Sequence, residues 1–229
     1  MSAAETGVVV VGGGTGALGR AVVRRMVGDG HRVLVPAREE HVEGLPAEVA
    51  VVRCDLSVPQ DVAAVDARAR ELGGWRALVN CSGGYAAATA LDTSEELLHA
   101  QLELNLLGPW RLATAAARAM VEAGEGGRIV TVASRAAVEP ARGQAAYQVS
   151  KAAVARLTQV MALELRDTGI TVNAVMPSTM DTSANRASMP KADWSRWVSV
   201  DDVAATIAWL LSPEASIVSG ALVPVYGRA

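Results

Sequence analysis

Three polar side chains in the second half of the chain have the types and spacing for proton transfer to or from a substrate oxygen. Tyr147 and Lys151 are four residues apart, so on a helix both side chains lie on the same face. A free tyrosine has a pKa of about 10, and a cation about 4 Å away lowers it by about three units at an effective dielectric constant of about 20. Ser134 precedes Tyr147 by 13 residues, and its hydroxyl can donate to the same oxygen. We therefore predict that Lys151 lowers the pKa of Tyr147, although this spacing also occurs on ordinary helix surfaces.

A glycine-rich segment near the start of the chain is typical of a loop that binds a dinucleotide. The apolar run at residues 8–11 leads into residues 12–19, which read GGGTGALG, and residues 20–27 continue with helical spacing. Glycines let the backbone approach a pyrophosphate closely, and the start of a helix offers free N–H groups and the positive end of its dipole. A glycine string alone often marks only a turn, but this position between a strand and a helix favours dinucleotide binding.

Two charged residues after the next strands bear on which dinucleotide binds. Arg38 follows the apolar run at residues 32–35. An acidic residue near this point accepts hydrogen bonds from the ribose 2′-hydroxyl of NAD, whereas an arginine can pair with the 2′-phosphate of NADP. Arg38 therefore favours NADP(H), with NAD(H) as a possible second cofactor and a solvated surface arginine as the alternative. Asp55 could accept from the adenine amino group or cap the turn that begins near Ser57.

These side chains need a scaffold that brings distant segments together. Short runs rich in β-branched residues alternate with longer stretches of helical spacing, which is typical of βαβ units around a buried parallel sheet. Helices are predicted over residues 20–27, 109–122, 144–167 and 201–211. Strands are predicted over residues 8–11, 32–35, 50–53, 77–79, 128–132, 171–175 and 221–225. No linker or repeat divides the chain, so we expect a single domain over residues 1–229.

Composition excludes several classes of function. Hydrophobic residues make up 51% of the chain and charged residues 20%, as expected of a globular protein with a substantial core. The net charge of −3 argues against a nucleic-acid or membrane partner. There are only two cysteines, positions 1–7 lack a signal-peptide pattern, and no apolar run approaches the roughly 18 residues of a membrane span, so we expect a cytoplasmic protein. The three histidines lack ligand spacing, and no metal site is expected.

The chain resembles the short-chain dehydrogenase/reductase family over nearly its whole length. The resemblance depends on the glycine loop, Asp55, the sequence NCSG at residues 80–83, Asn105 in NLLG, Ser134 with the Tyr-x-x-x-Lys pair, and PSTMDT at residues 177–182. It implies an α/β Rossmann-type doubly wound fold with a seven-stranded, mostly parallel sheet. It also implies an NADPH-dependent carbonyl reductase or alcohol dehydrogenase, which transfers hydride between nicotinamide and a small ketone, aldehyde or alcohol.

The resemblance implies a role for several of these matching positions. Tyr147 would be the general acid/base, Ser134 would orient the carbonyl oxygen, and Lys151 would hold the nicotinamide ribose and lower the Tyr147 pKa. Asn105 would position a water that links Lys151 to solvent, and Thr182 would hold the nicotinamide carboxamide. The helices that carry Asn105 and Tyr147 pair in relatives, so we expect a homodimer or homotetramer. The implied cofactor contacts are Gly13, Thr15, Gly16, Ala17, Leu18, Gly19, Arg38, Asp55, Leu56, Asn80, Ser82, Gly83, Tyr147, Lys151, Pro177, Thr179, Met180 and Thr182.

The chain departs from the family pattern at a few positions. Gly12 and Ala17 replace a threonine and a glycine of the usual loop, Cys81 and Ser82 replace asparagine and alanine, and Ser178 replaces a glycine. We expect the altered NCSG segment to change local support while leaving the backbone contacts of its first and last residues intact.

The segment at residues 178–198 is predicted to be a loop with short helices that forms a substrate lid. Its two tryptophans, Trp194 and Trp197, could form a substrate wall or simply pack. Residues 181–193 resemble the lid of quinonoid dihydropteridine reductase, whereas Ser134 and Arg38 point away from that branch. The alternatives are therefore a dihydropteridine- or quinone-type reductase and, in another class, a non-catalytic NADP(H)-sensing binding protein.

Overall fold

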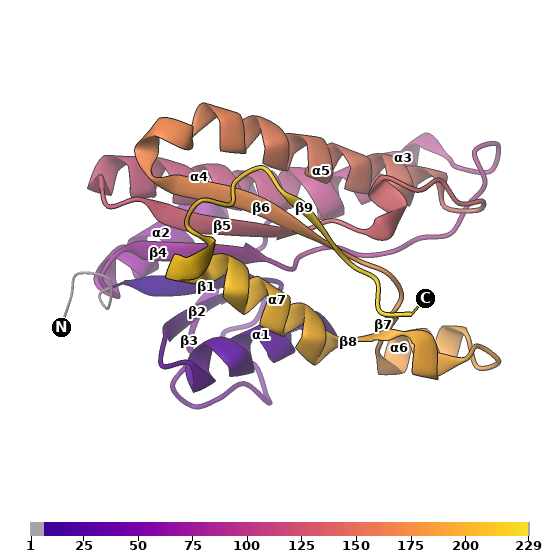
Figure 1. The fold of residues 1–229 in the computed structure, drawn as a ribbon, viewed down its shortest axis with the longest axis horizontal. Coiled ribbons are helices and arrows are strands. Elements are labelled where there is room, and N and C mark those ends of the chain that lie inside the picture. Colours follow the sequence, from indigo (N-terminus) through magenta and orange to yellow (C-terminus); the bar gives the residue numbers. More distant parts are fainter. Residues whose placement is uncertain (1–6, 229) are drawn as a thin grey trace.

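The alternation of strand-like and helical segments produces one parallel sheet with helices on both faces (Figure 1). The computed structural model describes residues 7–228, so the expectation about a signal sequence falls almost wholly on positions outside it. Within that range the sheet has seven strands in the order β3-β2-β1-β4-β5-β6-β9. The strands are β1 (Val8–Gly12), β2 (Arg32–Ala37), β3 (Ala50–Arg53), β4 (Trp75–Asn80), β5 (Gly127–Val132), β6 (Ile170–Pro177) and β9 (Leu222–Val225).

The predicted strands and the doubly wound fold are confirmed. Every pairing between neighbouring strands is parallel in the described part of the chain, whereas a mostly parallel sheet was expected. The four valines of β1 are at most 1% exposed, because a central parallel strand is covered on both faces and therefore reads as an unbroken apolar run. Proline has no N–H to donate within a sheet, yet strand β2 continues through Pro36. The strand tolerates this proline because beyond Leu34 it pairs only with β3.

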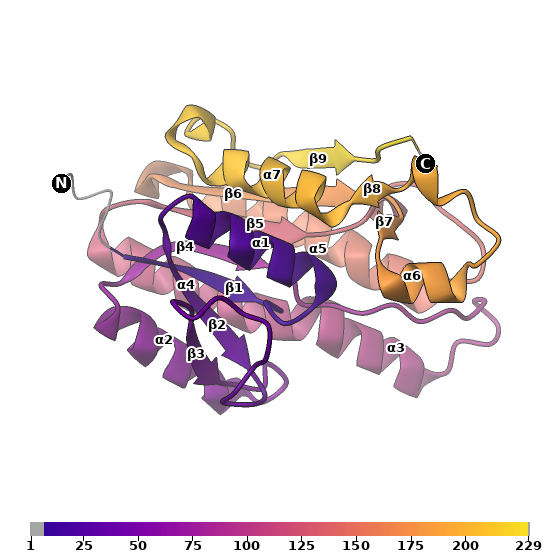
Figure 2. The same ribbon diagram turned by 90° about the horizontal axis from the view of Figure 1, so that it is seen from below.

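Two layers of helices cover the sheet (Figure 2). Helices α1 and α7 pack on one face, and α2, α4 and α5 pack on the other. The predicted helix over residues 144–167 ends earlier, at Glu164, and a separate 3-10 turn follows at Arg166–Thr168. The helices are α1 (Ala17–Gly28), α2 (Val62–Glu71), α3 (Glu95–Leu102), α4 (Gly108–Ala123), α5 (Ala145–Glu164), α6 (Ser183–Ser188) and α7 (Val200–Leu211).

The segment after β6 projects beyond the carboxyl end of the sheet, beside the end of the chain (Figure 1). It contains β7 (Met180–Asp181), the short helix α6, a 3-10 turn at Trp194–Arg196 and β8 (Val198–Ser199), and β7 pairs with β8. The expected loop with short helices at residues 178–198 is therefore present. Across residues 7–228, no helix has both the length and the apolar character needed to cross a membrane.

Candidate active site

The chemistry-bearing residues gather where the parallel strands end. The glycine loop follows β1, Asn80 ends β4, and Ser134 lies two residues after β5. The carboxyl ends of parallel strands lie at the same edge of a sheet, and this edge is where open α/β folds bind ligands. The topology therefore joins a nucleotide-type loop to the predicted acid/base residues.

Two glycines of the loop lie so close to neighbouring backbone that neither leaves room for a side chain. Gly13 has a φ of 70°, and a Cβ there would lie 2.7 Å from the backbone nitrogen of Ser82. A Cβ on Gly19 would lie 2.0 Å from the carbonyl oxygen of Gly13. The start of α1, at Gly16, has no side-chain cap, so its first N–H groups point outward without a side-chain partner. This bare helix start beside a close-packed loop fits a pyrophosphate.

The charged residues Arg38 and Asp55 contact each other beside this loop. The Nε of Arg38 lies 3.1 Å from Oδ2 of Asp55. The other carboxylate oxygen of Asp55 accepts from the backbone N–H of Ser57 at 2.9 Å and from its hydroxyl at 2.8 Å. These bonds to Ser57, followed by Arg38, hold the pKa of Asp55 below its usual range. The turn-capping alternative for Asp55 is therefore realised in this structure. The carbonyl of Leu56 accepts from Arg111 at 2.9 Å.

Tyr147 and Lys151 lie on the same face of α5, as their spacing predicts, and meet the end of β5. The Nζ of Lys151 donates to the carbonyl oxygen of Val132 at 2.8 Å, and only 5% of Lys151 is exposed. The side chain of Ser134 lies close enough to the Tyr147 phenol to lower the pKa of that phenol. The three residues named from the sequence are thus brought together.

The predicted effect of Lys151 on Tyr147 is wrong in this structure. Burial raises the pKa of Tyr147, and neighbouring Tyr85 raises it further, while only the polar side chain of Ser134 lowers it. Burial also lowers the pKa of Lys151 from 10.5 to about 8. The thiol of Cys81 faces Lys151, but burial raises its pKa to about 12, so it supplies no negative charge at neutral pH. For both groups, the effect of burial on the pKa is therefore larger than any effect of their charges on each other.

Asn105 joins the loop after β4 to the helix that carries Tyr147. It is 1% exposed and lies in a π-helical turn at Glu103–Leu107, between α3 and α4. Its side chain accepts from the N–H of Gly84 at 2.8 Å and donates to the carbonyl of the same residue at 3.0 Å. It also donates to Gln101 at 3.2 Å and to Ser150 at 3.0 Å. Asn105 therefore clamps the loop after β4, and its expected water-positioning role stays a prediction.

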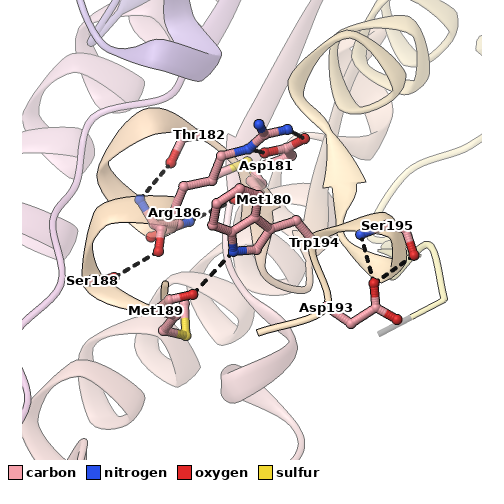
Figure 3. A network of polar contacts seen from close by, with 10 residues as sticks. Met180, Asp181, Thr182, Arg186, Ser188, Met189, Asp193, Trp194 and Ser195 are labelled. Atoms are coloured by element: carbon pink, nitrogen blue, oxygen red, sulfur yellow. Dashed lines mark hydrogen bonds and ion pairs between the residues drawn. The ribbon is translucent and has the colours of Figure 1, made fainter. Parts of the chain in front are cut away.

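The predicted lid has an internal polar network (Figure 3). Arg186 donates two hydrogen bonds to the carboxylate of Asp181, each of 2.6 Å. Its guanidinium also lies 4.7 Å from the centre of the Trp194 ring. The indole N–H of Trp194 donates to the carbonyl of Met189 at 3.1 Å. Trp194 therefore packs within the segment itself. Thr182 caps α6, since its hydroxyl accepts from a backbone N–H at 3.2 Å.

Comparison with known proteins decides the family. A family model described as short chain dehydrogenase matches residues 7–193. The chain belongs to the short-chain dehydrogenase family. It is similar to the 3-oxoacyl-(acyl-carrier-protein) reductase MabA of Mycobacterium tuberculosis, with 32% identity over 231 residues that cover 96% of this chain and 91% of that protein.

Solved structures agree with this assignment. A short-chain type dehydrogenase/reductase from Mycobacterium ulcerans superimposes with a TM-score of 0.89 at 28% identity, covering 96% of this chain and 88% of that chain. Acetoin dehydrogenase from Enterobacter cloacae superimposes with a TM-score of 0.87 at 29% identity, covering 97% and 94%. This short-chain dehydrogenase is therefore an NAD(P)-dependent oxidoreductase by family, while the likeness of its lid to quinonoid dihydropteridine reductase stays a prediction.

Two departures from the family pattern have visible consequences in this short-chain dehydrogenase. Gly12 stands in place of the usual threonine, and the Oδ1 atom of Asn80 is buried without a hydrogen-bond partner among the described residues. A Cβ on Gly12 would lie 2.9 Å from that atom and 2.9 Å from the side chain of Leu112, so a larger residue at this position requires local movement. The hydroxyl of Ser178 donates to the carbonyl of Tyr226 at 2.7 Å, which ties the start of the lid to the end of the chain.

Sequence reasoning missed three residues near the site. Gln101 and Ser150 are at most 5% exposed and support Asn105, and Ser150 also donates to the carbonyl of Tyr147 at 2.7 Å. Tyr85 packs against Tyr147. Helical spacing from Asn105 could have identified Gln101, but only the fold brings the other two to the site. Among residues 7–228, no group of three or more His, Cys, Asp or Glu side chains is placed to hold a metal ion.

Replacing Gly19 with alanine is expected to weaken nicotinamide-dinucleotide binding by about 10-fold or more, because overpacking a tight site costs about 1–3 kcal/mol. The new Cβ would overlap the Gly13 carbonyl, and relieving the overlap moves the loop that faces the pyrophosphate. Titration of protein fluorescence with the cofactor measures the dissociation constant. Gly28→Ala in the same helix is the control, since nothing lies within 4 Å of its Cβ position. Equal affinities of the two variants would contradict the role of the loop.

Proposed function

We propose that this short-chain dehydrogenase is an NADPH-dependent carbonyl reductase, or the corresponding alcohol dehydrogenase, acting on a small ketone, aldehyde or alcohol. The observation that carries the proposal is the meeting of Ser134, Tyr147 and Lys151 at the sheet edge that also holds the glycine loop. Two similar proteins are named a 3-oxoacyl reductase and an acetoin dehydrogenase, which supports this reaction type. We also propose that residues 1–229 form one dinucleotide-binding domain in a cytoplasmic protein.

The side chains divide the work of reduction among them. A bound nicotinamide supplies the hydride. Tyr147 donates the proton that the substrate oxygen takes up, and its raised pKa keeps the phenol protonated at neutral pH. Ser134, which lies beside Tyr147, donates to the same oxygen and stabilises the negative charge that develops there. With a pKa of about 8, Lys151 is mostly charged at pH 7 and would hold the nicotinamide ribose.

The remaining site residues would hold the cofactor and cover the substrate. The glycine loop would bind the pyrophosphate, and the segment from Asn80 to Gly83 would line the adenosine side. Thr182 would hold the carboxamide, because its hydroxyl, while capping α6, still has its own proton to donate. We propose that residues 178–198 close over the substrate, with Trp194 serving to stiffen the lid.

Replacing Arg38 with aspartate is expected to lower the preference for NADPH over NADH by about 10- to 100-fold, since a hydrogen bond to a charged group contributes about 1.5–3 kcal/mol. The side chain of Arg38 is 73% exposed, so its guanidinium can turn from Asp55 toward a 2′-phosphate. The ratio of kcat/KM for the two cofactors measures the effect. Arg68→Ala on α2 is the control, and an unchanged ratio in the Arg38 variant would remove its assigned role.

A cofactor-oxidation screen tests the whole proposal. Purified protein is mixed with NADPH or NADH and with ketones, aldehydes, quinones or a quinonoid pterin. We expect turnover of ketones or aldehydes with NADPH, lost in Ser134→Ala. Turnover of a quinone or pterin that survives Ser134→Ala indicates the alternative reductase, because that chemistry needs no serine. Tight NADPH binding without turnover of any compound indicates a sensing protein.

The outer face of α4 and α5 supports the proposal of a homodimer or homotetramer. Large apolar side chains on these helices are 40–64% exposed, among them Trp110, Val121, Val160 and Leu163. The two helices also border a groove of about 410 Å³. Because several large apolar side chains on one face are costly to leave in water, we propose that two copies of the chain bury this face together. Light scattering on the purified protein measures the mass in solution.

A further inference from the structure

Tyr85 is an aromatic residue beside the reactive phenol that the mechanism above does not use. Its ring centre lies 5.1 Å from that of Tyr147, and the planes meet at 72° in an edge-to-face contact. Yet Tyr85 is 63% exposed, whereas a ring that packs in the hydrophobic core would be buried. Most of its surface is therefore free to meet a ligand.

The loop that carries Tyr85 is held at both ends. On one side, Asn105 bonds to both the N–H and the carbonyl of Gly84. On the other side, the carbonyl of Ala88 accepts from the N–H of Ala145 at 3.1 Å, which is two residues before Tyr147. The backbone that carries Tyr85 is thus anchored on both sides of this residue, and the edge-to-face contact places its ring against Tyr147. Such an arrangement suits a binding surface, because little freedom is lost when a ligand arrives.

The rest of this loop carries only small side chains. Residues 86–88 are alanines, and Gly84 packs so closely that a Cβ there would lie 2.6 Å from the side chain of Leu104. Tyr85 is accordingly the one large side chain that the sequence supplies between residues 84 and 88. Because its ring contacts that of Tyr147, Tyr85 lies within reach of a group attached to a carbonyl that Tyr147 protonates.

We propose that Tyr85 is a specificity-determining residue that packs against a flat, conjugated substituent of the substrate carbonyl. The site then favours aryl or α,β-unsaturated ketones and aldehydes over saturated ones of the same size. Aromatic rings gain from offset or edge-to-face contact beyond the apolar area that they bury. This inference depends on the proposed reductase function and adds a substrate class to it.

Paired substrates test the inference while cancelling effects on the chemical step. Acetophenone and cyclohexyl methyl ketone share the reacting group and differ in the flatness of the ring. We expect the wild type and Tyr85→Phe to favour acetophenone, and Tyr85→Leu to lower the ratio of kcat/KM by about 5- to 10-fold, the size of an aromatic pair contact. The change should lie in KM for acetophenone, with kcat little affected, whereas a merely structural role would lower kcat for both ketones. An equal ratio in all three proteins overturns the inference and leaves the reductase function standing.

Binding measurements decide the inference independently of turnover. Calorimetry of each ketone with the protein saturated with NADP⁺ should show tighter binding of acetophenone that is lost in Tyr85→Leu. Leu91→Ala is the matched control, since Leu91 is 98% exposed and lies beyond the Ala88 anchor. If no carbonyl is reduced by the wild type, the proposed function fails. In that case a ring-dependent binding preference still supports the role of Tyr85, and equal binding of both ketones overturns it.

Discussion

Replacing Tyr147 with phenylalanine is expected to lower kcat/KM for a ketone substrate by about 10³-fold, within the range that general acid catalysis contributes. The phenylalanine keeps the ring that packs on Tyr85 and removes only the phenolic hydroxyl. The proton for the substrate oxygen must then come from water, while the glycine loop and its affinity for NADPH are untouched. Steady-state NADPH oxidation and a separate cofactor titration measure the two quantities.

Tyr226→Phe provides the control for this experiment. Burial raises the pKa of Tyr226 as it does that of Tyr147, but its ring lies under the guanidinium of Arg135, at 5.1 Å, and it has no assigned chemical role. We expect its turnover to match the wild type. A Tyr147→Phe protein that retains full turnover with unchanged cofactor affinity would remove the acid/base assignment.

Replacing Lys151 with methionine is expected to reduce turnover by about 10²-fold or more, because a charged group that acts at the reacting centre is lost. The same substitution is expected to stabilise the fold at pH 7. Folding shifts the pKa of this lysine from 10.5 to about 8, which corresponds to a cost of about 3 kcal/mol for burying the ammonium group. Methionine avoids that cost, although it leaves the carbonyl of Val132 without its donor, a loss of about 1 kcal/mol. Chemical denaturation measures the net gain, about 2 kcal/mol by this difference.

The pH dependence identifies the origin of this gain. Between pH 8 and 10.5 the unfolded wild type holds the lysine proton while the folded protein has released it, so its stability rises with pH in that window. Below pH 8 both states are protonated, and the full cost of the buried charge is present. The advantage of Lys151→Met should therefore be largest at pH 7 and shrink toward pH 10.5. An advantage that is the same at pH 7 and pH 10 would show that the charge of Lys151 is not its cause.

Much of the scaffold followed from local patterns in the sequence. The seven strands were predicted because each is a short β-branched run, and a parallel strand covered on both faces tolerates little else. The Tyr147 and Lys151 pair was predicted to share a helix face because four residues span one helical turn. The position of the glycine loop, between β1 and α1, likewise follows from the order of residues along the chain.

The tertiary structure alone decided how the site is charged and enclosed. Spacing placed Lys151 near Tyr147, but the lowered pKa of the lysine and the raised pKa of the tyrosine come from desolvation, which depends on segments packed from elsewhere in the chain. Asn105 reaches Gly84 across 21 residues, and Tyr85 meets Tyr147 across an even longer stretch, so no local pattern reports either contact. Periodicity along the chain describes which face of an element is buried. It does not describe which neighbour covers that face, and the neighbour sets both the protonation and the shape of the site.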